Sequence, residues 1–271
     1  MQIAKPKVLI VISFFHPYRG GAEQQALLLA AELQRQGMAV CVLTRHFAGL
    51  PGTEIIKGVP IHRAIHTLPW GKLFGICYFF SCLWFFIKNR RSYDIIHCYI
   101  LQGFHSMAAI IMKYLFGKKV VIRISATGPL SDFSLLRQGL GGAFFLRCIR
   151  KADKIIILCS QSQQEALAAG FSPEQIVYIP NGVDIAVFIP SLKPAISNTI
   201  LFAGRLDKMK GIDVLLASIA ELRDRGIACS CTIVGDGPSL KELQHLNADL
   251  TLDGQVVFTG AGWYKKEKVD V

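Results

Sequence analysis

The stretch VLIVISFFHPYRGGAEQQALLLAAELQRQGMAVCVLT, residues 8–44, indicates the fold class. It begins with the apolar run Val8 to Phe15, which has the length of a buried strand. A loop ending in Gly20-Gly21 leads into Ala22 to Gln36, where apolar residues recur at helical spacing, and Ala39 to Thr44 is a second apolar run. Strand, helix and strand in this order form the unit from which parallel sheets are built.

The same alternation continues to residue 180 and predicts a complete, doubly wound, Rossmann-like domain over residues 1–180. Two further segments, Phe47 to His66 and Gly128 to Gly141, carry no interpretable motif and are expected to be loops. The remaining strands are expected at Asp94–Cys98, Lys119–Ile124, Lys154–Leu158 and Ile176–Ile179, and helices at Leu73–Lys88, Gly103–Phe116, Leu136–Arg150 and Ser162–Ala169.

A second α/β pattern follows a linker over residues 181–198, which begins at the breaker Asn181-Gly182 and is rich in Pro and Ser. Residues 199–271 are expected to form a partial Rossmann-like domain with an unfinished sheet edge. Its predicted elements are strands Thr199–Ala203, Ala228–Val234 and Gln255–Phe258, and helices Ile212–Arg225 and Ser239–Leu246.

The net charge of +11 is unevenly distributed. Residues 1–180 contain 20 Lys and Arg against 8 Asp and Glu, or +12, whereas residues 181–271 contain 10 against 11, or −1. A basic first domain predicts an anionic partner such as a membrane surface or a phosphorylated substrate. Nucleic acid is disfavoured, because the cations are scattered and no reader motif is present. The eight cysteines lie mostly in apolar runs without metal-ligand spacing and indicate buried thiols in a reducing cytosol.

Leu73 to Ile87 is the most hydrophobic stretch and contains seven Phe, Tyr and Trp residues. Its 15 residues are fewer than the roughly 20 that a spanning helix needs. A core helix is one interpretation, since large apolar side chains are usually buried. The other is a helix lying in the membrane interface, because Lys88, Arg90 and Arg91 follow it.

Two loops have the composition of a phosphate site. Gly20-Gly21 opens directly onto a helix, where backbone N–H groups can approach an anion, although a tight turn alone would also explain the pair. The spacing is not GxGxxG, which disfavours a dinucleotide-dependent oxidoreductase. In the second domain Gly204, Arg205 and Lys210 lie between a strand and a helix, where open sheets bind ligands. The cations could hold a diphosphate or be solvated surface residues.

The next loop, Gly235-Asp236-Gly237, lies at the same predicted edge and could contact a nucleotide base or ribose, or be only a turn. With this loop an ordered set of motifs is complete, and it resembles glycosyltransferase family 4 over nearly the whole chain. The set comprises Gly20-Gly21-Ala22-Glu23, Asp94-Ile95-Ile96-His97, Ile179-Pro180-Asn181-Gly182-Val183-Asp184, Gly204-Arg205-Leu206 with Lys210-Gly211, and Val234-Gly235-Asp236-Gly237-Pro238 followed by Val257-Phe258-Thr259-Gly260.

The resemblance implies a GT-B-type α/β fold, in which the first domain binds the acceptor and the second a nucleotide-sugar donor. It implies transfer with retention of configuration and no metal or other cofactor, in keeping with the lack of an Asp-x-Asp pair. Gly20, Gly21, Gly204, Arg205 and Lys210 would then hold the donor diphosphate. Gly235, Asp236 and Gly237 would contact the nucleotide.

The resemblance also implies catalytic candidates. His97 is one, with a satisfied core histidine as the alternative. Ser125 is the other candidate. Many members carry a histidine just after the strand Val120–Ile124, and this chain has Ser125-Ala126-Thr127-Gly128 there instead. Family members continue into a helix with paired glutamates that hold the donor, a segment not seen before Val271, so we expect a C-terminally truncated member.

These observations predict a cytoplasmic glycosyltransferase, peripheral at the inner face of the cell membrane, that transfers sugar to a glycan or lipid-linked acceptor. The alternative is a non-catalytic member that binds a partner or an anionic membrane through its basic first domain.

Overall fold

The computed structural model describes residues 5–18, 20–68, 71–101, 103–128, 131–139, 141–189 and 198–260. The chain divides into two compact units, residues 1–184 and 185–271. The predicted boundary after residue 180 lies close to this division, and residues 190–197 of the predicted linker lie outside the described part.

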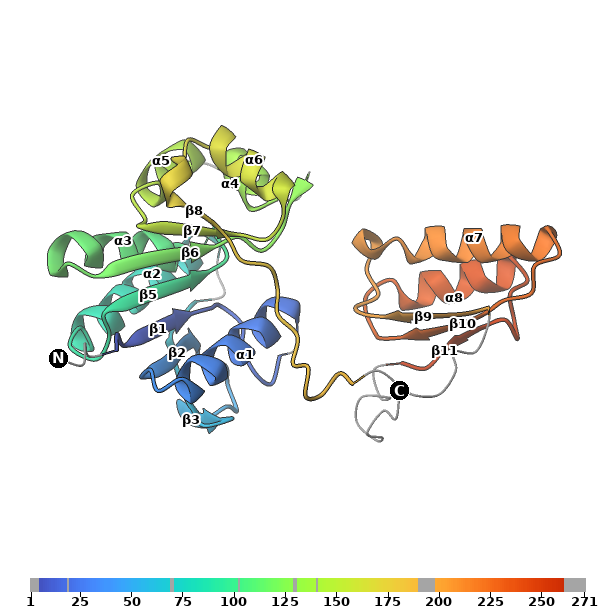
Figure 1. Ribbon diagram of the computed structural model, residues 1–271, viewed down its shortest axis with the longest axis horizontal. Coiled ribbons are helices and arrows are strands. Elements are labelled where there is room, and N and C mark those ends of the chain that lie inside the picture. The colour runs from blue at the N-terminus through green and yellow to red at the C-terminus, as the bar shows by residue number, and fades with distance from the viewer. Residues whose placement is uncertain are drawn as a thin grey trace. The chain divides into compact units, whose positions relative to one another are not determined.

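Unit 1 contains an eight-stranded sheet in the order β3-β4-β2-β1-β5-β6-β7-β8. Figure 1 shows the part of this sheet from β1 through β5, β6 and β7 to β8. All neighbouring strands are parallel except β3 and β4, so seven strands have their carboxyl ends at one edge. The strands are β1 (Val8–Val11), β2 (Val40–Arg45), β3 (Thr53–Ile56), β4 (Val59–Ile65), β5 (Ile95–Tyr99), β6 (Lys119–Arg123), β7 (Lys154–Ile157) and β8 (Ile176–Tyr178).

Helices cover both faces of this sheet, as predicted for a doubly wound fold. Helix α1 packs over one face, where Ala26, Leu27 and Ala30 meet alternate residues of β1, β2 and β4. The other helices share one apolar core on the opposite face. The helices are α1 (Gly21–Arg35), α2 (Gly71–Lys88), α3 (Phe104–Phe116), α4 (Asp132–Gln138), α5 (Gly142–Ile149) and α6 (Ser160–Ala168).

The prediction of a loop over Phe47 to His66 is wrong, because this segment forms the hairpin β3–β4. Lys57 and Gly58 both have positive φ at its turn, and β4 alternates regularly between buried and half-buried residues. Pro60 and the buried Arg63 interrupt the apolar pattern of β4. Arg63 is satisfied there by an ion pair with Glu54 (2.6 Å) and by backbone carbonyls, so burial of its charge is compensated.

The prediction of one helix over Leu136 to Arg150, after a loop, is also wrong. Helix α4 begins earlier, at Asp132, with Ser131 accepting a hydrogen bond from the Ser134 amide. The chain then turns at Gly141, whose φ is 78°, and α5 starts anew. A side chain at Gly142 would lie 1.8 Å from the Leu136 carbonyl oxygen, which shows how closely the two helices meet.

Unit 2 contains a parallel sheet in the order β11-β10-β9, and Figure 1 shows α7 and α8 on one face of it. The strands and helices that were predicted are present, within two residues of the expected bounds at most ends. The elements are β9 (Thr199–Ala203), α7 (Ile212–Asp224), β10 (Ser230–Val234), α8 (Leu240–Asp249) and β11 (Val256–Phe258). Their apolar residues form a core separate from the two cores of unit 1.

Helix α2 is buried on one side and exposed on the other, so the core interpretation is confirmed for one side and the membrane interpretation stays a prediction. Tyr78, Cys82, Phe85 and Phe86 are buried in the core of unit 1. The other side of the helix exposes an apolar stripe made of Leu73, Ile76, Phe80, Trp84 and Ile87. In the described part of the chain, no helix is long and apolar enough to cross a membrane.

Candidate functional site

The two predicted donor loops of unit 2 lie against each other at the carboxyl ends of β9 and β10. The Gly204 amide donates to the Val234 carbonyl (3.0 Å), and the Leu206 amide donates to the Asp236 carbonyl (3.0 Å). The Ser239 amide in turn donates to the Leu206 carbonyl (3.1 Å). These bonds join residues 204–211 and 235–238 into one surface, as the sequence predicted from their positions after neighbouring strands.

The glycines of the second loop permit this close approach. A Cβ at Gly235, whose φ is 154°, would lie 1.8 Å from the Gly204 carbonyl oxygen, and one at Gly237 would lie 2.2 Å from the Leu206 oxygen. Glycine is therefore required at both positions for packing between the loops. A role for Asp236 and its two glycines in nucleotide contact stays a prediction.

The predicted phosphate-binding cations project from the first of these loops into solvent. The Arg205 side chain is 72% exposed, and its nearest acidic group is the Asp207 carboxylate, 3.7 Å away. Lys210 is exposed at the last position before Gly211 and helix α7. Asp207 also accepts a hydrogen bond from the Met209 amide, which orders the turn between the two cations. An exposed cation pair beside a helix N-terminus has the electrostatic character of an anion site.

In unit 1, Gly20 and Gly21 begin helix α1 at the carboxyl edge of the sheet. Gly20 is extended and caps the helix, whereas a Cβ at Gly21 would meet no atom of the described residues within 4 Å. The first amides of a helix have no acceptor within the helix itself. The Glu23 carboxylate, however, already lies beside Gly20, where an added Cβ would be 2.3 Å from its oxygen, so binding of a further anion at this helix end stays a prediction.

The Asn181-Gly182 motif docks at the same edge, through contacts that sequence reasoning missed. The Gln25 side chain on α1 donates to the Gly182 carbonyl (2.7 Å) and accepts from the Gly182 amide (3.1 Å). Arg123, at the end of β6, donates to the Asn181 side chain. The motif is thereby tied to both α1 and the sheet.

His97 lies within β5 rather than at its carboxyl end, and only 6% of its surface is exposed. Burial and the neighbouring Arg123 guanidinium lower its pKa to about 3, so the ring is neutral at pH 7. Among the residues that the structure describes, none forms a hydrogen bond with its Nε2. Burial favours a core histidine, but the unpaired Nε2 means that it is not the satisfied core histidine that the sequence offered as the alternative, and a catalytic role stays a prediction.

Ser125 lies just after β6, exposed at the carboxyl edge, and its amide donates to the Asp132 carboxylate (2.6 Å). Its hydroxyl can therefore reach a ligand at this edge, although a catalytic role stays a prediction.

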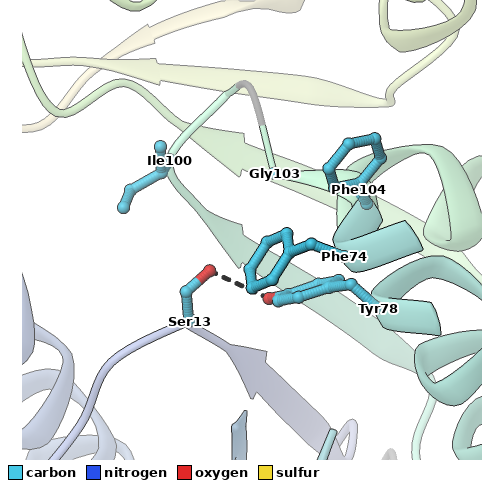
Figure 2. A pocket seen from close by; sticks show the side chains of 6 residues that line it. All are labelled: Ser13, Phe74, Tyr78, Ile100, Gly103 and Phe104. Carbon is cyan, nitrogen blue, oxygen red and sulfur yellow. Dashed lines mark hydrogen bonds between the residues drawn. The ribbon is translucent and has the colours of Figure 1, made fainter. Parts of the chain in front are cut away.

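A cavity of about 190 Å³ opens at this edge between β1, α2 and α3 (Figure 2). Tyr78 reaches from α2 toward Ser13, and the two hydroxyl oxygens are 2.9 Å apart. No motif marked these residues in the sequence. The cavity is lined by Ser13, Phe74, Tyr78, Ile100, Gly103 and Phe104.

A second hollow, of about 290 Å³, is lined by the cations Arg147, Arg150 and Lys151 together with Gly170. It lies between the end of α5 and the start of β7. The charge count predicted that unit 1 is basic, but not that cations gather at this position. Within the described residues, no three His, Cys, Asp or Glu side chains are grouped so as to hold a metal ion. Metal independence stays a prediction.

Comparison with known proteins identifies the class. The sequence profile of Glycosyltransferase Family 4 matches residues 19–187, and that of Glycosyl transferases group 1 matches residues 187–270. The chain belongs to glycosyltransferase family 4.

Several of the similar curated proteins have names that include an inositol compound. The chain is 27% identical to a phosphatidylinositol N-acetylglucosaminyltransferase subunit from Arabidopsis thaliana, over 95% of this chain and 58% of that protein. It is 29% identical to D-inositol 3-phosphate glycosyltransferase of Nocardiopsis dassonvillei, over 76% of this chain and 53% of that protein. The chain thus spans somewhat more than half the length of these relatives.

Solved structures of the same architecture confirm the GT-B-type fold. Anabaena Alr3699/HepE in complex with UDP and glucose gives a TM-score of 0.69 at 19% identity, covering 94% of this chain and 69% of that one. The catalytic domain of starch synthase IV from Arabidopsis thaliana, bound to ADP and acarbose, gives 0.66 at 13% identity, covering 94% and 74%.

Proposed function

We propose that this protein acts in transferring a sugar from a nucleotide-sugar donor to a glycan or lipid-linked acceptor, with retention of configuration, in polysaccharide or glycolipid biosynthesis. The observation that carries the proposal is the surface formed by residues 204–211 and 235–238, where two cations stand beside a helix N-terminus. HepE, a similar structure, was solved with UDP and glucose, which supports a nucleotide sugar as donor.

Arg205 and Lys210 hold the donor diphosphate in this proposal. Negative charge grows on the departing diphosphate as the sugar is transferred, and the two cations stabilise it without a metal ion. Gly204 allows close backbone approach, and Asp236 contacts the nucleoside between Gly235 and Gly237. Gly20 and Gly21 offer backbone amides from the acceptor-side unit, and Ser125 hydrogen-bonds the transferred sugar.

In this proposal the protein is peripheral at the cytoplasmic membrane face, where a lipid-linked acceptor would lie. The apolar stripe on α2 supports this part, since Phe80 and Trp84 are each 61% exposed and Lys88 follows them. An exposed aromatic stripe flanked by cations is the composition of a helix that lies in the headgroup region. The relative named for phosphatidylinositol supports a lipid-linked acceptor.

Calorimetric titration with UDP, GDP and ADP tests the donor site. We expect one nucleotide to bind with micromolar affinity, and Arg205→Ala with Lys210→Ala to weaken it at least tenfold, because each charge-assisted bond contributes about 1.5 to 3 kcal/mol. Arg225→Ala with Lys241→Ala removes two cations from the same unit and should leave the affinity unchanged. Equal losses in both double variants would reject the assignment of the site.

A further inference from the structure

The cavity lined by Ser13, Tyr78 and Phe104 lies at the carboxyl ends of β1 and β5, the edge that also carries Gly20 and Gly21. We infer that it is a subsite for one ring of a neutral polyhydroxylated ligand, in which Ser13 Oγ accepts a hydrogen bond from a ligand hydroxyl. The inference rests on the proposed function in one respect: that function makes the ring a part of the acceptor substrate.

A chain of hydrogen bonds fixes which way the Ser13 hydroxyl points. Tyr78 Oη lies 2.9 Å from Ser13 Oγ on one side and 2.9 Å from His105 Nδ1 on the other. His105 Nε2 lies 2.9 Å from the Tyr99 carbonyl oxygen. A carbonyl can only accept, so Nε2 carries the proton and Nδ1 of the neutral ring is an acceptor.

The direction of each remaining bond follows from this terminal carbonyl. Tyr78 must donate its single proton to His105 Nδ1, and Ser13 must then donate its own proton to the Tyr78 oxygen. His105 is fully buried, which lowers its pKa to about 4 and keeps the ring neutral at pH 7. With its proton engaged, Ser13 offers only lone pairs to the cavity. The cavity therefore favours a ligand that donates.

The walls of the cavity suit a ring with apolar C–H faces. Phe74 and Phe104 contribute aromatic rings, as Figure 2 shows, and the electron-rich face of such a ring attracts weakly positive C–H groups. The six lining residues are uncharged and offer a phosphate no ion pair, while the Arg45 guanidinium, 4.9 Å from the centre of the Phe74 ring, is not part of the lining. A volume of about 190 Å³ is below the 300 to 1,000 Å³ of typical ligand pockets, which fits one ring of a larger molecule.

Two glycines and one strained residue hold this arrangement. A Cβ at Gly103 would lie 2.0 Å from the His105 ring, and one at Gly75 would lie 2.4 Å from the Phe104 ring. Ile100, in the lining, has φ of 73°, an outlier for a β-branched residue. Strain of this kind persists where the surroundings enforce it and clusters at ligand sites.

Saturation-transfer NMR with methyl α-D-glucopyranoside, myo-inositol and the monodeoxyfluoro analogues of the glucoside tests the inference. Fluorine replaces one hydroxyl and cannot donate, so one analogue should bind the wild-type protein about 3- to 10-fold more weakly than its parent. Ser13→Ala should weaken the parent to the same degree and abolish the difference between the two. Ser92→Ala, an exposed control in the same unit, should change neither.

Tyr78→Phe provides a second variant if Ser13→Ala fails to fold. It frees the Ser13 proton, so Ser13 can donate as well as accept and the discrimination against the fluoro analogue should decrease. The inference would be overturned if neither methyl α-D-glucopyranoside nor myo-inositol binds. It would also be overturned if both variants distinguish the glucoside from its fluoro analogue as strongly as the wild-type protein does. The nucleotide titration separates the outcomes: a protein that binds nucleotide but no polyol refutes this subsite alone, and one that binds polyol but no nucleotide refutes the donor site.

Discussion

His97 and His105 are both buried in unit 1, yet their ring nitrogens are satisfied differently. His105 has a partner at each nitrogen, a hydroxyl and a carbonyl. The His97 ring is tilted against Tyr99 with ring centroids 5.0 Å apart, and its Nε2 has no partner in the described part of the chain. Burial is the largest cause of the lowered pKa of each ring. The same residue type at neighbouring positions therefore serves packing in one case and a polar network in the other.

Both histidines make stability depend on pH. In the unfolded chain a histidine gains a proton as pH falls through about 6.5, whereas the folded rings stay neutral down to about pH 4 and 3. Below about pH 6.5 the unfolded state therefore binds more protons than the folded state, so the folded state becomes less stable as the pH is lowered. We expect each histidine to lower the free energy of unfolding by about 1.4 kcal/mol between pH 7.5 and 5.5.

Urea unfolding at these two pH values checks this expectation. His97→Gln should show a loss smaller by about 1.4 kcal/mol than that of the wild-type protein. The same loss in both proteins would show that His97 takes up its proton in the folded state.

At the scale of elements, α2 has two apolar sides with different surroundings. One packs into the core of unit 1, and the stripe of Leu73, Ile76, Phe80, Trp84 and Ile87 faces solvent. Lys88 lies 4.7 Å from the centre of the Trp84 ring, which places a cation at the end of the stripe. An exposed apolar stripe of this extent is typical of an interaction surface.

We predict that α2 binds vesicles that contain anionic lipid. Phe80→Ser with Trp84→Ser should reduce co-flotation with phosphatidylcholine–phosphatidylglycerol vesicles at least tenfold, because insertion of each large side chain is worth about 1.5 to 3 kcal/mol. Val214→Ser with Ile227→Ser removes exposed apolar residues from unit 2 and should have no effect. Vesicles of phosphatidylcholine alone should bind the wild-type protein more weakly. Undiminished flotation of the α2 variant would exclude the stripe as the membrane contact.

At the scale of the whole molecule, the chain has separate cores. The described residues of the unit 2 core come from β9 to β11 and the helices between them, and none belongs to a core of unit 1. Cooperative unfolding follows shared cores, so a change within one unit should act on that unit alone.

Gly235→Ala tests this independence. The new Cβ would overlap the Gly204 carbonyl oxygen at a φ that other residues rarely adopt, so we expect unit 2 to lose at least about 2 kcal/mol of stability. Hydrogen exchange followed by mass spectrometry should show faster exchange in peptides of residues 199–258 and unchanged protection in residues 8–178. Gly52→Ala, where a Cβ would meet no atom within 4 Å, is the control. Faster exchange in both units would contradict the prediction.

Local sequence patterns were sufficient to predict the fold class, most helices and the parallel strands. Apolar periodicity and glycine breaks are local, so α1, α3 and the elements of unit 2 were predictable from neighbouring residues. The hairpin β3–β4 was not, because Pro60 and the buried Arg63 hide its alternation and their compensation lies elsewhere in the chain. The adjacency of the loops at Gly204 and Gly235 was predictable, since parallel strands place successive loops at one edge.

The surroundings of His97 and the network of Ser13, Tyr78 and His105 became visible only in the folded molecule. His97 lies on β5. Ser13 follows β1, Tyr78 lies on α2 and His105 on α3, and no sequence spacing predicts that these three meet. The packing of helices against the sheet determines which hydroxyl lines a cavity and which histidine finds hydrogen-bond partners. Local patterns record the backbone preferences and burial of a segment, whereas hydrogen-bond direction and the size of a cavity arise from side chains that meet only through tertiary packing.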